Sequence, residues 1–197
     1  MSPPTRAHRG DGVTQVRSIL LAALSVEVAV LVITGIALYF VYVPTGSQAW
    51  SDVFPAGRGA GVRLADAIRL LHRLAAVLAV STALATCIVL ALRGRPDVRR
   101  WTGSVLGVGI VLTTVAVSVT GYLLPWDQLA LWAVTVGTDI KGYRWLANDS
   151  VRFVLMGGVE VDKATVLRWL EIHVLVLTPV LIGLVALAWR RLRATPG

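Results

Sequence analysis

Cysteine, histidine and charge are all scarce in this chain of 197 residues. It has one cysteine, three histidines and 15% charged residues, whereas 56% of its residues are hydrophobic. A single cysteine, Cys87, allows no internal disulfide, and no Cys-x-x-Cys-His motif is present to attach a c-type haem. The low charge and the positive mean hydropathy are atypical of soluble globular domains and indicate a membrane protein.

Long apolar runs are what the sequence has instead. A helix needs about 20 residues to cross a hydrocarbon core of about 30 Å. Four runs have this character, at residues 18–43, 67–92, 104–124 and 166–189. They are continuous rather than alternating, which excludes a transmembrane β-barrel. The predicted fold class is an all-α membrane protein, a four-helix transmembrane bundle forming one domain over residues 17–193.

The segments outside these runs differ in composition. Residues 1–16 are polar and contain Gly, Arg and Pro, so we expect a disordered cytoplasmic arm. Residues 44–66 are rich in Gly and Pro and are expected to form a surface loop. Between the third and fourth runs, Trp and Leu residues over 126–136 predict a short interfacial helix, because Trp favours the membrane boundary.

Basic residues set the expected orientation. They gather in the N-terminal tail, in the connection between the second and third runs, and at the C-terminus, with few acids to balance them. By the positive-inside rule both termini are cytoplasmic and the protein is a multi-pass protein of the cell (inner) membrane. The net charge of +8 is therefore a topology signal, and nucleic-acid binding is not expected.

Two of the three histidines lie within the apolar runs. His72 and His173 each stand near the outer end of a run, whereas His8 lies in the tail and is read as a solvated bystander. Two imidazoles at matched depth on two helices are suited to clamp a metal or a haem iron from opposite sides. The alternative is that each imidazole bonds a backbone carbonyl or faces a polar cavity.

Arginines and glycines near the histidines favour a haem. Arg69, Arg73 and Arg168 are suited to pair with the two propionates, although snorkelling to the interface is an alternative explanation. Gly35 and Gly121 lie at the depth of the histidines on the other two runs. A porphyrin between helices needs such surface without side chains.

Three motifs carry a resemblance to a known family: 68-IRLLHR-73, 120-TGYLLPWDQLALWAV-134 and 157-GGVEVDKATVLRWLEIH-173. With them, the chain resembles the N-terminal, haem-bearing half of cytochrome b, and most closely the short, split form of photosynthetic Rieske–cytochrome b complexes. The resemblance implies that His72 and His173 are the axial ligands of a non-covalent outer haem b, with Gly35 and Gly121 as its packing gaps. It also implies that Arg69, Arg73 and Arg168 are its propionate partners. The implied roof of an outer quinone pocket consists of Pro125, Trp126, Leu129 and Trp132.

The chain departs from this family at the inner level. The family carries a second histidine about fourteen residues after the first on two helices, and those positions here are Thr86 and either Leu187 or Ala188. The inner glycine expected on the first helix is replaced by Leu21, although Gly107 keeps its place on the third. We therefore expect one haem b and no second, inner haem.

Glu27 is the one acid deep within a run. A charged carboxylate at the bilayer centre costs a few kcal/mol, so Glu27 is either protonated or faces a polar cavity. We expect a hydrogen-bonded structural role, with a proton or quinone site as the alternative.

The expected function is that of a membrane electron-transfer subunit within a larger respiratory or photosynthetic oxidoreductase complex, rather than an enzyme alone. It would relay electrons between quinone, quinol or a membrane partner and an extracytoplasmic redox protein. Expected partners are membrane lipid and other redox subunits, such as a Rieske protein, a cytochrome c or a catalytic oxidoreductase subunit; a homodimer is left open. The family's Pro-Glu-Trp-Tyr loop is not found, so a complete quinol pocket would need walls from a partner. Two alternative functions are a non-redox anchor or assembly subunit that retains the fold, and a metal-ion or small-molecule transporter that uses His72 and His173 as its binding site.

Overall fold

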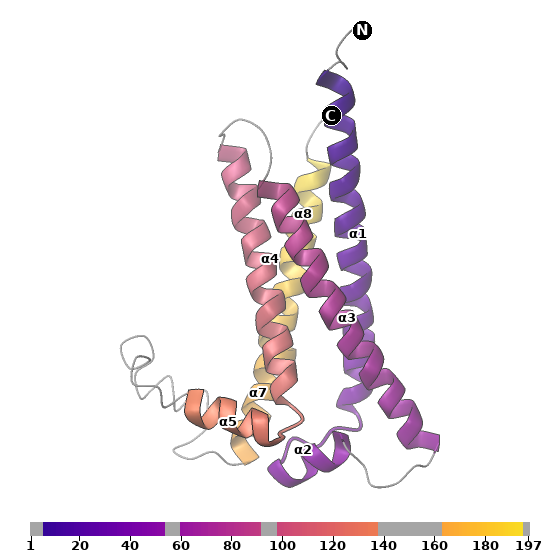
Figure 1. Ribbon diagram of the computed structural model, residues 1–197, viewed down its shortest axis with the longest axis vertical. Helices are drawn as coiled ribbons and strands as arrows, with labels where there is room; N and C mark the ends of the chain where they lie inside the picture. Colours follow the sequence, from indigo (N-terminus) through magenta and orange to yellow (C-terminus); the bar gives the residue numbers. More distant parts are fainter. Residues whose placement is uncertain (1–5, 54–59, 92–97, 138–162, 195–197) are drawn as a thin grey trace. The chain divides into compact units, whose positions relative to one another are not determined.

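The computed structural model describes residues 6–53, 60–91, 98–137 and 163–194. The regular elements in these ranges are all helical (Figure 1). In chain order they are α1 (Arg6–Tyr39), α2 (Gly46–Val53), α3 (Ala60–Ala91), α4 (Val98–Leu123), α5 (Gln128–Gly137), α7 (Lys163–Glu171), the π-helix η2 (Ile172–Leu177) and α8 (Thr178–Arg193).

Four helical stretches of the described residues are long and apolar enough to cross a membrane. They are Gln15–Tyr39, Arg63–Val89, Thr102–Leu123 and Ala164–Arg193, the last running through α7, η2 and α8. Each overlaps one of the four apolar runs of the sequence, so the predicted all-α membrane fold class is confirmed. The predicted short helix after Pro125 is present as α5.

Helix α1 begins at Arg6, so residues 6–16, expected as a disordered arm, are helical. The segment after Pro4 contains no further proline until Pro44, and a helix already fixed by an apolar span extends at little cost once nucleated. Residues 1–5 lie outside the described ranges.

The chain divides into two compact units, and the long helices contribute to both. The first unit comprises Met1–Ile33, His72–Val115 and Pro179–Gly197. Its core is a cluster of aliphatic side chains drawn from α1, α3, α4 and α8, namely Leu21, Leu24, Val28, Ala79, Ala83, Leu106, Ile110, Leu181, Val185 and Ala188. Alanines on α3 make room for leucines of the neighbouring helices, which is the close packing that associates helices in lipid.

The second unit comprises Thr34–Leu71 and Ala116–Thr178. Its small core joins Leu123, Ala130 and Val134, with Trp126 and Trp169 packed against them. The hydroxyl of Tyr42 donates a hydrogen bond to the carbonyl oxygen of Leu124, which ties the segment after α1 to the end of α4. Burial, and secondarily the negative charge of Asp52, raises the pKa of Tyr42 above its usual range, so this phenol stays a neutral donor.

Helix α2 lies where the sequence led us to expect only a loop, and that expectation is wrong for residues 46–53 and also for residues 60–66, which form the start of α3. The backbone N–H of Gln48 donates to the Thr45 hydroxyl at 3.4 Å, and the same hydroxyl lies 3.4 Å from the Gln48 side-chain oxygen. Thr-x-x-Gln is the spacing of a capping box, which supplies partners for the first N–H groups of a helix. That spacing was the signal in the sequence, and the surrounding glycines and prolines obscured it.

Candidate functional site

His173 lies on the π-helix η2 and is only 9% exposed. Its carbonyl oxygen accepts two hydrogen bonds from Thr178, one from the backbone N–H and one from the hydroxyl at 2.7 Å. The next residue, Pro179, has no N–H to continue the regular ladder. The helix accommodates this missing donor with one π-turn, in which Thr178 donates to the residue five positions earlier. Such π-turns are frequent at functional sites.

The imidazole of His173 packs directly on α4. A Cβ atom added at Gly121 would lie 2.9 Å from Cε1 of this ring, closer than real Cβ atoms approach other heavy atoms. The neighbouring hydroxyl of Thr120 lies 3.0 Å from Nδ1 of the same ring. The glycine that the sequence assigned to a packing gap is therefore the surface on which the His173 ring rests.

His72 belongs to the first unit and is half-buried on α3. Its ring hydrogen-bonds to the backbone of Leu31 on α1. Both predicted histidine ligands are thus held by a polar group of another helix, His72 by a backbone group and His173 by a hydroxyl. A hydrogen bond to one ring nitrogen orients a histidine and fixes which nitrogen carries the proton.

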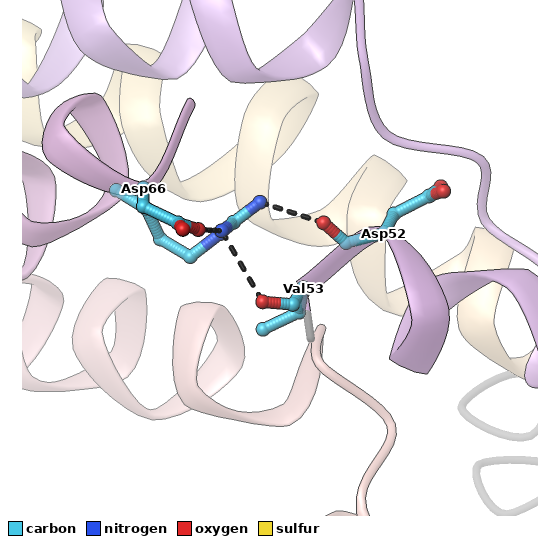
Figure 2. A network of polar contacts seen from close by, with 4 residues as sticks. Asp52, Val53 and Asp66 are labelled. Carbon is cyan, nitrogen blue, oxygen red and sulfur yellow. Dashed lines mark hydrogen bonds and ion pairs between the residues drawn. The ribbon is translucent and has the colours of Figure 1, made fainter. Parts of the chain in front are cut away.

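Arg69 is engaged by α2 (Figure 2). Its guanidinium donates to the carbonyl oxygens of Asp52 at 2.8 Å and Val53 at 3.3 Å, and to the Asp66 carboxylate at 2.7 Å. Asp52 and Val53 are the last residues of α2, so the guanidinium caps its carbonyl end, where a positive charge is favoured. The Arg69 side chain is 15% exposed, and both of its terminal nitrogens donate to protein oxygens.

The other two predicted arginines are exposed. Arg168 donates to Glu171 at 2.8 Å, a surface pair of the kind that contributes about 0–1 kcal/mol. For Arg73, one residue after His72, no hydrogen bond or ion pair is found among the described residues. Of the three arginines, Arg73 therefore has the fewest hydrogen bonds to other described residues.

The expected roof residues do not share one environment. Pro125 is buried and Trp126 half-buried, whereas Leu129 is 58% and Trp132 63% exposed on α5. Trp126 has a φ of 52°, a left-handed conformation that costs a bulky residue about 1–3 kcal/mol. The backbone N–H of Trp126 donates to the carbonyl oxygen of Leu123, which closes the turn. Its indole lies near Gly46, where an added Cβ atom would be 3.5 Å from Nε1, an ordinary contact distance.

Three of the four residues named at the positions of the missing inner histidines and glycine are buried in the first unit. Leu21 and Ala188 are 3% and 5% exposed and belong to its aliphatic core, and Thr86 is 2% exposed. Leu187, the other candidate for the position after His173, is 41% exposed. The π-helix at His173 has one more residue in its turn than an α-helix. Counted from His173, this extra residue brings Ala188 rather than Leu187 to the buried face of α8.

Glu27 is half-buried on α1, and one of its carboxyl oxygens accepts a hydrogen bond from the Thr82 hydroxyl at 2.9 Å. The other oxygen is buried and has no hydrogen-bond partner among the described residues. Gly35 is half-buried on the same helix in the second unit.

A family model described as Cytochrome b/b6/petB matches residues 15–195. This chain belongs to the cytochrome b family. Cytochrome b6 of Prochlorococcus marinus (strain MIT 9215) is 35% identical to it over 147 residues, 73% of this chain and 65% of that protein. Cytochrome b6 of Porphyra purpurea is 35% identical over 150 residues, 74% of this chain and 67% of that protein.

The fold is similar to one chain of a solved structure titled "Hyperthermophilic respiratory Complex III". The TM-score is 0.70 at 24% identity, and the match covers 93% of this chain and 48% of that chain. The predicted family is therefore confirmed, while this chain spans 65% of the length of the first of these cytochrome b6 relatives.

Sequence reasoning missed the two threonines that contact His173. Thr120 and Thr178 are unremarkable residues within apolar runs, and nothing in their spacing announces an imidazole. A partial signal exists, because each glycine predicted to face the cofactor follows a threonine, in Thr34-Gly35 and in Thr120-Gly121.

The close approach at Gly121 predicts that Gly121→Ala destabilises the chain. The added Cβ displaces the His173 ring, and overpacking of this kind costs about 1–3 kcal/mol, more than the roughly 0.5–1 kcal/mol that alanine adds in a helix. Thermal unfolding of the purified, haem-free chain in detergent should show a lower midpoint. Gly109→Ala on the same helix is the control, because its Cβ would meet Leu184 at an ordinary 3.8 Å. Equal midpoints for the two variants would contradict the prediction.

Proposed function

We propose that this chain is a membrane electron-transfer subunit that carries a single haem b, ligated by His72 and His173. Membership of the cytochrome b family implies haem b binding. The observation that carries the finer proposal is the setting of His173, a buried imidazole resting on a glycine and hydrogen-bonded through Nδ1 to a hydroxyl.

The donor set fits a haem iron. The two neutral imidazoles would hold the haem iron through one ring nitrogen each, and each of these rings is already oriented by a second group of the protein. Gly121 provides a surface on which no side chain competes for the space beside the ring. When bound, the haem supplies the one-electron redox change, and the chain supplies ligation, burial and charge pairing that set its potential.

Arg73 is the proposed main propionate partner. A guanidinium pairs a carboxylate through two parallel hydrogen bonds, and Arg73 is exposed next to a proposed ligand. Arg168 can exchange its exposed Glu171 partner for a propionate at small cost, because surface pairs contribute little. Arg69 is assigned instead to holding α2, since both of its terminal nitrogens donate to carbonyl groups or to Asp66.

The proposal includes no inner haem. The positions of the missing inner histidines are Thr86 and Ala188, both buried, and Ala188 packs in the aliphatic core. Leu21 occupies the same core. These side chains supply no ligand for a second iron, and without a second haem the chain alone has no two-centre path for electrons across a membrane.

We propose further that the chain works with other redox subunits, such as a Rieske protein, a cytochrome c or a catalytic subunit, with a homodimer left open. Exposed Leu129 and Trp132 on α5 offer an apolar surface that such a subunit, quinone or lipid can cover. Quinone exchange, an inner-membrane location and cytoplasmic termini belong to this proposal.

A non-redox anchor is the second candidate, and the tightly packed His173 site argues against it because a site released from ligand binding need not keep a glycine there.

The haem-to-protein ratio tests the proposal. The purified chain should contain one haem b per polypeptide, with a reduced-minus-oxidised absorption spectrum of a six-coordinate, low-spin haem. His72→Ala and His173→Ala should each lose that spectrum, because one axial ligand is removed. His8→Ala, near the start of α1, is the matched control and should keep it. A chain free of haem supports the anchor instead, and two haems per chain would show that the inner site is intact.

Glu27 is proposed to be a protonated, hydrogen-bonded partner of Thr82 that holds α1 against α3. A neutral amide can replace a neutral carboxyl here, so Glu27→Gln should retain the haem, its midpoint potential and the rate of electron transfer from an added quinol analogue to the haem. Glu27→Leu, which removes the acceptor, should lower the thermal unfolding midpoint. A loss of the rate in Glu27→Gln with haem and stability unchanged would instead assign a proton-transfer role.

A further inference from the structure

The hydroxyl of Thr120 has three polar neighbours and one proton. Its oxygen lies 2.9 Å from the carbonyl oxygens of both Ala116 and Val117, and 3.0 Å from Nδ1 of His173. The carbonyl oxygens can only accept a hydrogen bond, whereas a neutral imidazole nitrogen donates in one tautomer and accepts in the other.

The geometry favours one of these tautomers. If the hydroxyl proton were directed at Nδ1, the Thr120 oxygen would face two carbonyl oxygens at 2.9 Å with no hydrogen between them, which is electrostatically unfavourable. If the hydroxyl donates to a carbonyl, as threonines in helices commonly do, its oxygen accepts from Nδ1–H. That arrangement gives the hydroxyl proton and the Nδ1 proton an acceptor each, and it leaves the lone pair of the imidazole on Nε2.

The setting makes this hydrogen bond significant. Thr120 is 5% exposed and His173 is 9% exposed, so little bulk water competes for either group. The ring also rests on Gly121, and its backbone carbonyl is held by both donors of Thr178. Ring position, backbone and tautomer of His173 are therefore fixed by three neighbouring residues before any ligand binds.

We propose that Thr120 is a positioning residue for His173. Its hydroxyl accepts the Nδ1–H hydrogen bond, presents Nε2 to the haem iron, and increases electron donation from the imidazole to the metal. A carbonyl, carboxylate or hydroxyl partner on the second nitrogen of a ligating histidine typically raises its basicity and its metal affinity. A more basic ligand stabilises ferric over ferrous iron and so lowers the midpoint potential. This inference rests on the proposed function and adds a determinant of the potential.

Thr120→Val and Thr120→Ser test this role. Valine keeps the shape and removes the oxygen, so the haem should bind about 10–100-fold more weakly, and its midpoint potential should shift to a more positive value. Serine keeps the oxygen and should restore both quantities. Thr86→Val is the matched control, because Thr86 is also buried, at 2% exposed, and its hydroxyl donates to the carbonyl oxygen of Thr82 at 2.7 Å. It should change neither quantity.

Each outcome decides the matter. A haem-loaded Thr120→Val with the potential and affinity of the unchanged chain overturns the inference and leaves the proposed function intact. Loss of haem in both Thr120→Val and Thr120→Ser also overturns it, because the methyl group rather than the hydrogen bond is then required. Loss in the valine variant with recovery in the serine variant supports it.

A second measurement needs no haem. Nitrogen-15 spectra of the haem-free chain in detergent, with the His173 signals assigned from His173→Ala, should show a protonated Nδ1 and an unprotonated Nε2. The reverse tautomer would overturn the inference. Because this measurement is independent of cofactor loading, it separates failure of the inference from failure of the proposed haem site.

Discussion

Polar groups within the membrane-spanning helices have no bulk water to bond, and the rest of the structure follows from that constraint. The backbone answers it by forming helices. Side-chain hydroxyl groups find a partner by donating to carbonyl oxygens one turn earlier, as Ser25, Ser81 and Thr86 do. Against this background the bonds that cross between helices are informative, because each joins two polar groups of different helices in an apolar setting.

The cross-helix bonds differ between the two units. In the first unit, the Trp189 indole donates to Ser25 and the Thr82 hydroxyl donates to Glu27, and both pairs accompany an aliphatic core. In the second unit, the bond between Thr120 and His173 stands beside aromatic packing and a strained turn at Trp126. Strain and buried polar groups concentrate at functional sites, whereas regular aliphatic packing gives stability.

The sequence predicted the features that depend on composition and spacing. The four spans follow from runs of apolar residues, and the two histidines stand out because imidazoles are rare in such runs. The Arg69 side chain caps α2 through contacts with residues 16 and 17 positions earlier in the chain. These contacts are close in sequence, but no hydrophobic periodicity predicts them. The partner of Arg69 is decided by which acceptors the fold brings within reach, so a role chosen from residue type alone was bound to be ambiguous.

The roles of Thr120 and Thr178 were beyond sequence reasoning for a related cause. Threonine within a helix usually satisfies its own hydroxyl locally, and only three-dimensional proximity shows that one of these oxygens also meets an imidazole. The glycine beside it was predictable as a close approach, but the group that approaches it was not. Residue size can be read from a sequence, whereas the identity of the neighbour requires the fold.

The π-helix that contains His173 also affects how this chain is compared with its relatives. One additional residue in a helical turn keeps His173 and Ala188 on the faces they occupy. A relative with an unbroken helix would present the same two faces with one residue fewer between them. The same number of residues counted from the histidine would therefore reach different helix faces in this chain and in such a relative. A structure-based alignment of the two would place a gap within this turn.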